Sequence, residues 1–215
     1  MKSFLNQNLA IQLHKNMDLF NQHNIQDGIQ IIKGLEYHSN FISKIEQKEI
    51  LNIIDNQVWL DDLKRRVQHY GYKYDYKKRS IDKSMLLGEI PSWCQVIGQK
   101  MQVNGIINFN PDQVIVNEYL PGQGITNHID CEPCFNDTIM SLSLASTCIM
   151  QFTNKDNLEE IIPILLEPCS LVVLKGDSRY NWMHGIKAVK TDNYFGQKII
   201  RNRRVSLTFR KVIIN

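Results

Sequence analysis

This chain of 215 residues has no long apolar run. No stretch approaches the roughly 20 consecutive apolar residues that a membrane-spanning helix needs. The opening segment, MKSFLNQNLAIQLHKN, places Leu5, Leu9 and Leu13 at helical spacing, but its Asn, Gln and His residues make it too polar for the core of a signal peptide. We therefore expect a soluble, intracellular protein that begins with an amphipathic helix.

The number of cysteines and the net charge are both low. The five cysteines are an odd number scattered along the chain, whereas a disulfide framework usually has an even count in a shorter chain. We therefore expect a reducing compartment, with Cys94, Cys148 and Cys169 in the core. Cys131 and Cys134 form a C-x-x-C pair, which is at most half of a zinc site. The net charge of +3 allows an acidic partner but does not argue for one.

The first part of the chain favours helices, and no repeat or Pro/Gly/Ser-rich linker separates it from the rest. Ser43 can cap a helix, because Glu46 follows three positions later as in a capping box, and the apolar stripe is made of Ile45, Ile50, Leu51 and Ile54. A second helix is predicted to start near Ser92, after Pro91, with an apolar face made of Trp93, Val96, Ile97 and Met101. We expect a connecting strand from Ile29 to Leu35 before both helices.

From about residue 112 the pattern changes to short alternating or apolar runs: QVIVNEY, TIMSLSL, CIMQF, IIPILL, SLVVL and RVSLTFRKV. Turn residues separate these runs, which is typical of an all-β barrel or jelly roll. A chain of this length fits one domain. We therefore predict an α+β protein in which N-terminal helices buttress one sheet of a jelly-roll core.

Two histidines and an aspartate in the β half have the spacing of metal ligands. His128 and Asp130 are two residues apart, so in an extended segment their side chains point the same way. His184 follows the strand run LVVLKGD. Two His and one carboxylate form the facial triad that suits Fe(II), because it leaves coordination positions open. The alternative is that H-x-D is a pair of surface polar groups, which this short pattern does not exclude.

The C-terminal run RVSLTFR alternates polar and apolar residues. Arg204, Ser206, Thr208 and Arg210 share one face, and two arginines there would ordinarily point to solvent. If that face is inward, both arginines need anionic partners, because an unpaired buried guanidinium is costly. A dicarboxylate co-substrate beside the metal would supply them. Asn117 and Tyr119 share a face of the run QVIVNEY and are candidate hydrogen-bond partners, although such residues at strand ends are more often structural.

Three ordered motifs, N-E-Y-L-P-G-Q-G-I-T-N-H-I-D, S-R-Y-N-W-M-H-G-I and R-V-S-L-T-F-R, resemble the AlkB family of nucleic-acid dioxygenases over roughly residues 60 to 212. Within the family, P-G-Q-G-I, S-L-S-L and S-R-Y-x-W-x-H-G-I are most similar to the AlkB-like domain of the tRNA wobble-uridine hydroxylases. The resemblance implies a double-stranded β-helix that uses Fe(II), 2-oxoglutarate and O₂. Together with the helical pattern of the first part of the chain, it gives one expected domain over 1–215, with a helical extension at 1–58, a nucleotide-recognition lid at 60–90 and a jelly-roll core at 112–212.

The resemblance also implies roles for individual residues. It makes His128, Asp130 and His184 the iron ligands, and the 2-oxoglutarate contacts become Asn117, Tyr119, Arg204, Ser206, Thr208 and Arg210. The family usually has Asn at the position of Ser206. Glu132 occupies a position where several family members place an acidic residue that contacts the base.

The stretch from Lys64 to Arg79 combines basic residues with tyrosines at every second position. Basic residues can meet phosphates and tyrosines can stack on an extruded base. The expected substrate contacts are Arg66, Tyr70, Tyr72, Tyr74, Tyr76, Lys77, Lys78 and Arg79. The alternative is that the tyrosine face packs on the barrel while the lysines stay solvated. The resemblance to the family's lid favours the first interpretation.

Three functions compete at this point. The first is an enzyme, expected to be a monomer, that oxidises an alkyl group on a nucleic-acid base, in RNA rather than DNA. The second is a protein-side-chain demethylase of the same family, which the Tyr, Lys and Arg content of the lid disfavours. The third is a nucleic-acid binding module with a vestigial metal site, which the intact set of ligands and arginines disfavours.

Overall fold

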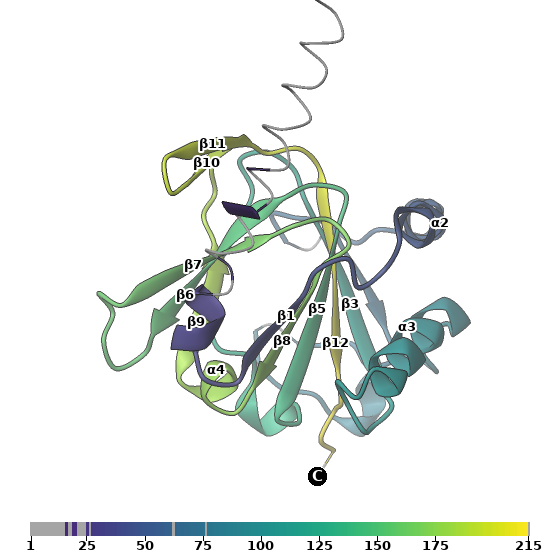
Figure 1. Ribbon diagram of the computed structural model, residues 1–215. Coiled ribbons are helices and arrows are strands. Elements are labelled where there is room, and N and C mark those ends of the chain that lie inside the picture. The colour runs from purple at the N-terminus through teal and green to yellow at the C-terminus, as the bar shows by residue number, and fades with distance from the viewer. Residues whose placement is uncertain are drawn as a thin grey trace, which may run out of the picture.

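The computed structural model describes residues 16, 19, 20, 25, 27–61, 63–75 and 77–214. Two antiparallel sheets face each other, and two helices lie along the outer side of the larger sheet (Figure 1). This arrangement confirms the predicted α+β jelly roll with buttressing helices. The helix predicted around Leu5, Leu9 and Leu13 lies outside the described residues.

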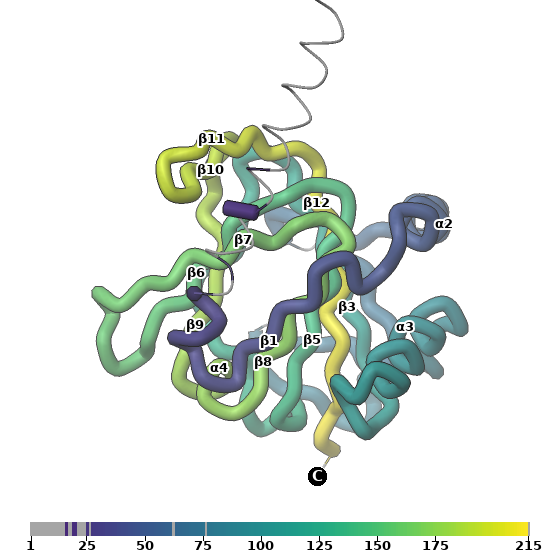
Figure 2. The backbone as a smooth tube through the Cα atoms, in the orientation of Figure 1, coloured from purple at the N-terminus to yellow at the C-terminus, as the bar shows by residue number. Residues whose placement is uncertain are grey.

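The larger sheet has six strands, and its last strand in sequence, β12, lies between β5 and β3 (Figure 2). Its strands in spatial order are β1 (Leu35–His38), β8 (Leu171–Lys175), β5 (Thr138–Leu144), β12 (Arg204–Arg210), β3 (Gln113–Tyr119) and β2 (Val67–Tyr70). The β1 strand belongs to the segment expected to be a helical extension, so that segment also contributes to the sheet.

The smaller sheet has four strands in the order β4 (Ile125–His128), β9 (Trp182–Ile186), β6 (Cys148–Asn154) and β7 (Ile161–Leu166). A separate hairpin is formed by β10 (Thr191–Tyr194) and β11 (Gln197–Ile200). Short helical segments after β1 are η1 (Lys83–Met85), η2 (Glu132–Cys134) and α4 (Asp177–Tyr180). Each apolar run predicted after residue 112 is therefore a strand.

The helices α2 (Lys44–Asp55) and α3 (Ser92–Val103) begin where the sequence predicts. Ser43 and Glu46 form the predicted capping box. Ile50 and Ile54 are buried, but the inclusion of Ile45 in the stripe is wrong, because it is 73% exposed. Five residues correspond to about 140° around a helix, which turns Ile45 away from Ile50.

The apolar face of α3 also differs from the prediction. Cys94, Ile97, Gly98 and Met101 are the buried residues, whereas Val96 is 61% exposed. The strand predicted from Ile29 to Leu35 is wrong as well. Residues 27–31 are helical, and the strand starts at Leu35, after the turn at Gly34. Among the described residues, no helix is both long and apolar enough to cross a membrane.

Strand β12 separates the apolar core from the interior cavity. Val205, Leu207 and Phe209 are fully buried in the cluster that includes α2 and α3. Each such side chain stabilises the fold by about 1.5–3 kcal/mol. The alternate residues, from Arg204 to Arg210, line a cavity on the other side of the sheet. The helices therefore fix which face of β12 points inward.

Candidate active site

Three possible metal ligands, two on neighbouring strands and one just after the first of them, meet at one end of this cavity. The ligand atoms of His128, Asp130 and His184 all lie within 4.8 Å of one another. His128 on β4 and His184 on β9 are register partners, and their ring centroids are 4.4 Å apart. The Nε2 atom of His184 lies 3.5 Å from Oδ2 of Asp130. The structure thus brings together the set predicted from the sequence.

A glycine allows β4 and β9 to approach closely enough for this arrangement. A Cβ atom at Gly185 would lie 2.2 Å from Oδ1 of Asn127 and 2.9 Å from its backbone nitrogen. The amide of Asn127 in turn donates a hydrogen bond to Oγ1 of Thr153 on β6, at 3.0 Å. A larger residue at position 185 would therefore push apart the two strands that carry the histidines.

Both histidines are arranged to offer a lone pair. The Nδ1 atom of His128 lies 2.8 Å from the carbonyl oxygen of Thr126. Because a carbonyl only accepts, Nδ1 must carry the proton, which leaves Nε2 free to bind a metal. Burial lowers the pKa of His184 to about 3, with a further contribution from the neighbouring His128. His184 is therefore neutral at ordinary pH, as a metal ligand must be.

The Asp130 carboxylate is buried and held by one oxygen only. Burial alone would raise its pKa, but Arg210 and the two histidines outweigh that effect and hold the pKa below the usual range. Nη2 of Arg210 donates to Oδ1 at 2.6 Å, whereas Oδ2 has no hydrogen-bond partner. A buried carboxylate oxygen without a donor calls for a cation. The donor set therefore fits a divalent metal ion.

A second arginine, Arg179 on α4, fixes the chain that carries Asp130. Its Nη1 donates to the carbonyl of Asp130 at 2.9 Å, and its Nη2 donates to the carbonyl of Cys131 at 3.3 Å. The side chain is 1% exposed, and burial lowers its pKa. The sequence pattern did not indicate this role, because nothing local shows that an arginine 49 residues away reaches this carbonyl.

The cavity that starts at the three ligands has a volume of about 410 Å³. Arg204 and Tyr119 are register partners on β12 and β3, as are Ser206 and Asn117, so these four side chains cover one wall. The predicted site residues that line the cavity are Tyr74, Arg79, Asn117, Tyr119, His128, Asp130, His184, Arg204, Ser206, Thr208 and Arg210.

The two arginines of β12 have different surroundings. Arg204 is 3% exposed, and its guanidinium lies 5.4 Å from the centroid of the Tyr119 ring. Its Nη2 donates to Oγ of Ser143 at 2.8 Å, but its Nε has no partner. No carboxylate in the described part of the chain forms an ion pair with it, whereas Arg210 is already paired with Asp130. Arg204 is therefore the residue that needs an added anion.

Two of the expected substrate residues point away from the cavity. Arg66 forms a two-point ion pair with Glu118, and its guanidinium lies 4.5 Å from the centre of the Trp59 ring. Tyr70 packs edge-on against Trp93 of α3, with ring centroids 5.7 Å apart. The substrate roles predicted for Arg66 and Tyr70 are therefore not supported by their positions.

The tyrosine alternation fails because β2 ends at Tyr70. Gly71 has φ of +76°, and a Cβ there would lie 1.8 Å from the carbonyl oxygen of Asp112, so the chain turns at this point. After the turn Tyr74 packs against Phe135 and lines the cavity. Tyr72 packs in the core between the sheets and does not line the cavity.

The remaining lid residues divide in the same way. Arg79 lines the cavity. Lys77 and Lys78 are exposed, and their backbone N–H groups donate to Asp75. Glu132 is exposed and is not part of the cavity wall, in contrast to its predicted contact with the base. Tyr76 lies outside the described residues.

Cys131 and Cys134, the C-x-x-C pair considered as half of a zinc site, are joined by a disulfide in the structure. Their sulfurs are therefore not available as thiolate ligands for zinc. Cys94, Cys148 and Cys169 are free and buried, as predicted.

Comparisons with known proteins agree with this geometry. A family profile described as the 2OG-Fe(II) oxygenase superfamily matches residues 4–210. An uncharacterized protein, L905, of Acanthamoeba polyphaga mimivirus is 35% identical over 182 residues, which are 85% of this chain and 86% of that protein. The tRNA (carboxymethyluridine(34)-5-O)-methyltransferase ALKBH8 of Macaca fascicularis is 38% identical over 203 residues. Those residues are 83% of this chain but only 30% of that protein.

The fold has a close match among solved structures. The structure of OsALKBH1 superposes with a TM-score of 0.66 at 18% identity, over 83% of this chain and 96% of that one. Such a match shows the jelly-roll fold. Together with the family profile and the relatives, it identifies an oxidoreductase whose cofactors are Fe(II), 2-oxoglutarate and O₂. The chain therefore belongs to the 2OG-Fe(II) oxygenase superfamily and, within it, to the AlkB family.

Proposed function

We propose that this AlkB-type dioxygenase oxidises an alkyl group on a nucleic-acid base, and that its substrate is RNA rather than DNA. His128, Asp130 and His184 would hold Fe(II). Arg204, with Asn117, Tyr119, Ser206 and Thr208, would bind 2-oxoglutarate. The observation that carries the proposal is a pair of unmatched charged groups in one cavity: among the described residues, one Asp130 oxygen has no donor and the Arg204 guanidinium has no carboxylate partner.

The metal and co-substrate supply, when bound, the oxidation of a substrate C–H bond coupled to decarboxylation of 2-oxoglutarate to succinate. The protein's own residues position these groups and exclude water. Arg210 holds one oxygen of Asp130, which leaves the other for the metal. The Thr126 carbonyl fixes the tautomer of His128. No side chain of the site has to act as a general acid or base in this scheme.

The side chains beside the cavity support a nucleotide as substrate. Tyr74 offers a ring for stacking, and Arg65 and Arg79 offer positive charge to a phosphate. A base has to leave its stack to reach the metal, which favours a single-stranded or flipped-out nucleotide. The preference for RNA is supported by the similarity to ALKBH8, whose name states an activity on tRNA, although the chain spans 30% of that protein.

The direct test is mass spectrometry of nucleosides after RNA, DNA and methylated peptides are each incubated with the protein, Fe(II), ascorbate and 2-oxoglutarate. We expect a modified nucleoside to be consumed in bulk tRNA, with one succinate formed for each turnover. His184→Ala, which removes a ligand, serves as the inactive control. Turnover only on DNA would overturn the preference for RNA, and turnover only on peptides would identify a protein demethylase.

A further inference from the structure

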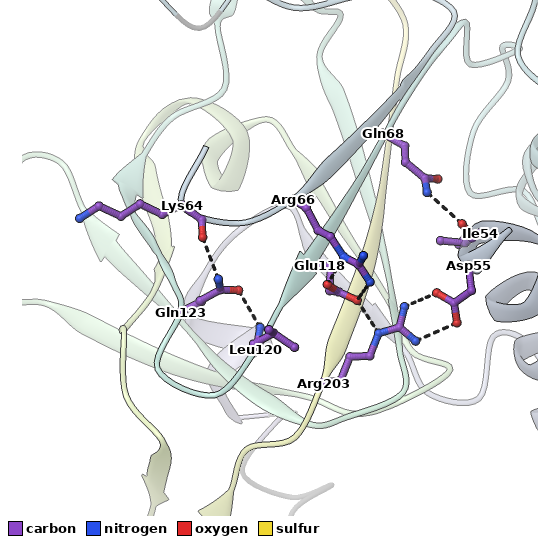
Figure 3. Close-up of polar contacts among 9 residues, drawn as sticks. All are labelled: Ile54, Asp55, Lys64, Arg66, Gln68, Glu118, Leu120, Gln123 and Arg203. Carbon is purple, nitrogen blue, oxygen red and sulfur yellow. Dashed lines mark hydrogen bonds and ion pairs between the residues drawn. The ribbon is translucent and has the colours of Figure 1, made fainter. Parts of the chain in front are cut away.

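The segment that leads into β2 is held at Lys64 by the turn after β3 and at Arg66 by β3 itself (Figure 3). Nε2 of Gln123 donates to the carbonyl of Lys64 at 2.7 Å. The backbone N–H of Glu118 donates to the carbonyl of Arg66 at 3.0 Å. The main chain before and after Arg65 therefore has a fixed position beside β3.

An ion-pair network strengthens this attachment from the outer side of the sheet. Glu118 is 3% exposed and binds both Arg66 and Arg203, and Arg203 also pairs with Asp55 at the end of α2 (Figure 3). Burial alone would raise the pKa of Glu118, but the two arginines outweigh it and lower that pKa. The carboxylate is therefore ionised and holds the segment to β3 and α2.

Arg65 itself turns to the inner side. Its Nε donates to Oδ1 of Asn117 at 2.8 Å, and its guanidinium lies 5.6 Å from the centroid of the Tyr119 ring. It lines the cavity, as do Asn117 and Tyr119. The guanidinium of Arg204 lies 5.4 Å from the centroid of the same ring. Arg65 thus reaches the wall proposed for 2-oxoglutarate from a segment outside the two strands that form it.

The chemistry of the Arg65–Asn117 pair determines which way the amide faces. Arginine has five N–H donors and no acceptor, so it can bind only the oxygen of the amide. The Asn117 nitrogen is left on the other side, and in the described part of the chain no hydrogen bond occupies it. Since Asn117 lines the cavity and is 7% exposed, this nitrogen is a donor available to a bound anion. A flipped amide would instead present oxygen, which repels a carboxylate.

We propose that Arg65 is a positioning residue for the co-substrate: by binding Oδ1 of Asn117, it keeps the amide nitrogen of Asn117 directed at 2-oxoglutarate. This inference rests on the proposed function, because it assumes that 2-oxoglutarate binds at this wall. It assigns to the segment that leads into β2, inside the expected lid at 60–90, a part in co-substrate binding that does not require the nucleic acid. Sequence alternation alone gives no such role, because Arg65 lies outside the strands.

The first test measures 2-oxoglutarate binding by calorimetry, with Mn(II) in place of Fe(II) so that no turnover occurs. Arg65→Met keeps an apolar stem beside Tyr119 but removes the donor. We expect the dissociation constant to rise about tenfold, the effect of one hydrogen bond to a charged ligand. Lys64→Ala is the matched control, because it also removes one positive charge but from an exposed neighbouring side chain. It should change the dissociation constant less than twofold.

The second test is a double-mutant cycle with Asn117→Ala. If Arg65 acts through Asn117, the Arg65→Met change should add less than twofold in the Asn117→Ala background. An additive tenfold loss would overturn the inference, because Arg65 would then contact the ligand directly. An unchanged affinity of Arg65→Met would also overturn it. Wild-type protein that does not bind 2-oxoglutarate at all would refute the proposed function instead, so the two failures are distinguishable.

Discussion

Two buried arginines three residues apart give a sharp test of the co-substrate site. Arg204 is 3% exposed and has no carboxylate partner in the described chain, whereas Arg201 is 5% exposed and pairs with Asp192. In Arg204→Met an unpaired buried charge is removed, so we expect the ligand-free protein to keep its stability or gain slightly. In Arg201→Met the buried Asp192 loses its partner, and we expect a loss of about 3–5 kcal/mol.

The stabilisation gained on adding 2-oxoglutarate should rank the two variants the other way: Arg204→Met should lose it and Arg201→Met should keep it. Loss of the ionic anchor at Arg204 costs about 2.7 kcal/mol of binding, which corresponds to roughly 100-fold in the dissociation constant. At a concentration 100 times the wild-type constant, 2-oxoglutarate stabilises the wild-type protein by about 2.7 kcal/mol. It would stabilise Arg204→Met by only about 0.4 kcal/mol at the same concentration.

Differential scanning calorimetry with Mn(II) measures both effects. For a domain of this size about 1 kcal/mol shifts Tm by roughly 2–4 °C. The ligand should therefore raise Tm by about 5–10 °C in the wild-type protein and by about 1 °C in Arg204→Met. In Arg201→Met the starting Tm should be lower, but the ligand-induced rise should be close to that of wild type. An undiminished rise in Arg204→Met would remove Arg204 from the co-substrate site.

Three further outcomes follow from the contacts of single residues. Arg210→Met leaves one oxygen of Asp130 unsupported, so Mn(II) affinity measured by titration should fall about 10- to 100-fold; an undisturbed affinity would show that this support is dispensable. Tyr74→Ala should weaken RNA binding, measured by fluorescence anisotropy, roughly tenfold or more. Tyr70→Ala is the control and should not weaken binding, because Tyr70 packs on the far side of the sheet. The reverse ranking would contradict the assignment of the two rings. The folded-state pKa of Glu46 is lowered from 4.5 to about 2, so its stabilising contribution is present above pH 4.5 and is lost as the pH falls toward 2; Glu46→Gln should flatten the stability profile in that window, and an unaltered profile would count against the shift.

The faces of β12 and β3 could be predicted because strand alternation is a local property. The run RVSLTFR assigns Val205, Leu207 and Phe209 to one face whatever the rest of the chain does. Alternation alone does not say which face is inward. The two arginines left that point open, since they would ordinarily face solvent, and only the resemblance to the AlkB family assigned the polar face to 2-oxoglutarate. The structure places that polar face on the cavity.

The lid was less predictable because one residue interrupts its pattern. Tyr70 and Tyr74 have the spacing of a single strand face, but the positive φ of Gly71 turns the chain between them. Tyr70 therefore packs against α3, and Tyr74 packs near the cavity. A glycine in a strand pattern is a known sign of such a break. Its presence could have limited the prediction to the part of the stretch after residue 71.

Arg65 and Arg179 were not indicated by any pattern, because their roles depend on contacts distant in sequence. Arg65 binds a residue 52 positions away, and Arg179 binds a carbonyl 49 positions away. Both lie outside the strands, so alternation does not assign them to a face. Only the burial and hydrogen bonds of the folded chain separate them from the exposed lysines and arginines nearby.

The charges around the cavity favour a nucleic-acid substrate over a methylated peptide. The lining contains four arginines, at positions 65, 79, 204 and 210, and one carboxylate, Asp130. With both histidines neutral as metal ligands, the excess is three positive charges. A divalent metal and a dianionic co-substrate cancel each other, so the excess persists in the loaded site. A methylated lysine or arginine peptide would bring positive charge toward this field, whereas a nucleotide brings a phosphate. The same arginines that complete the co-substrate site therefore favour nucleic acid over protein.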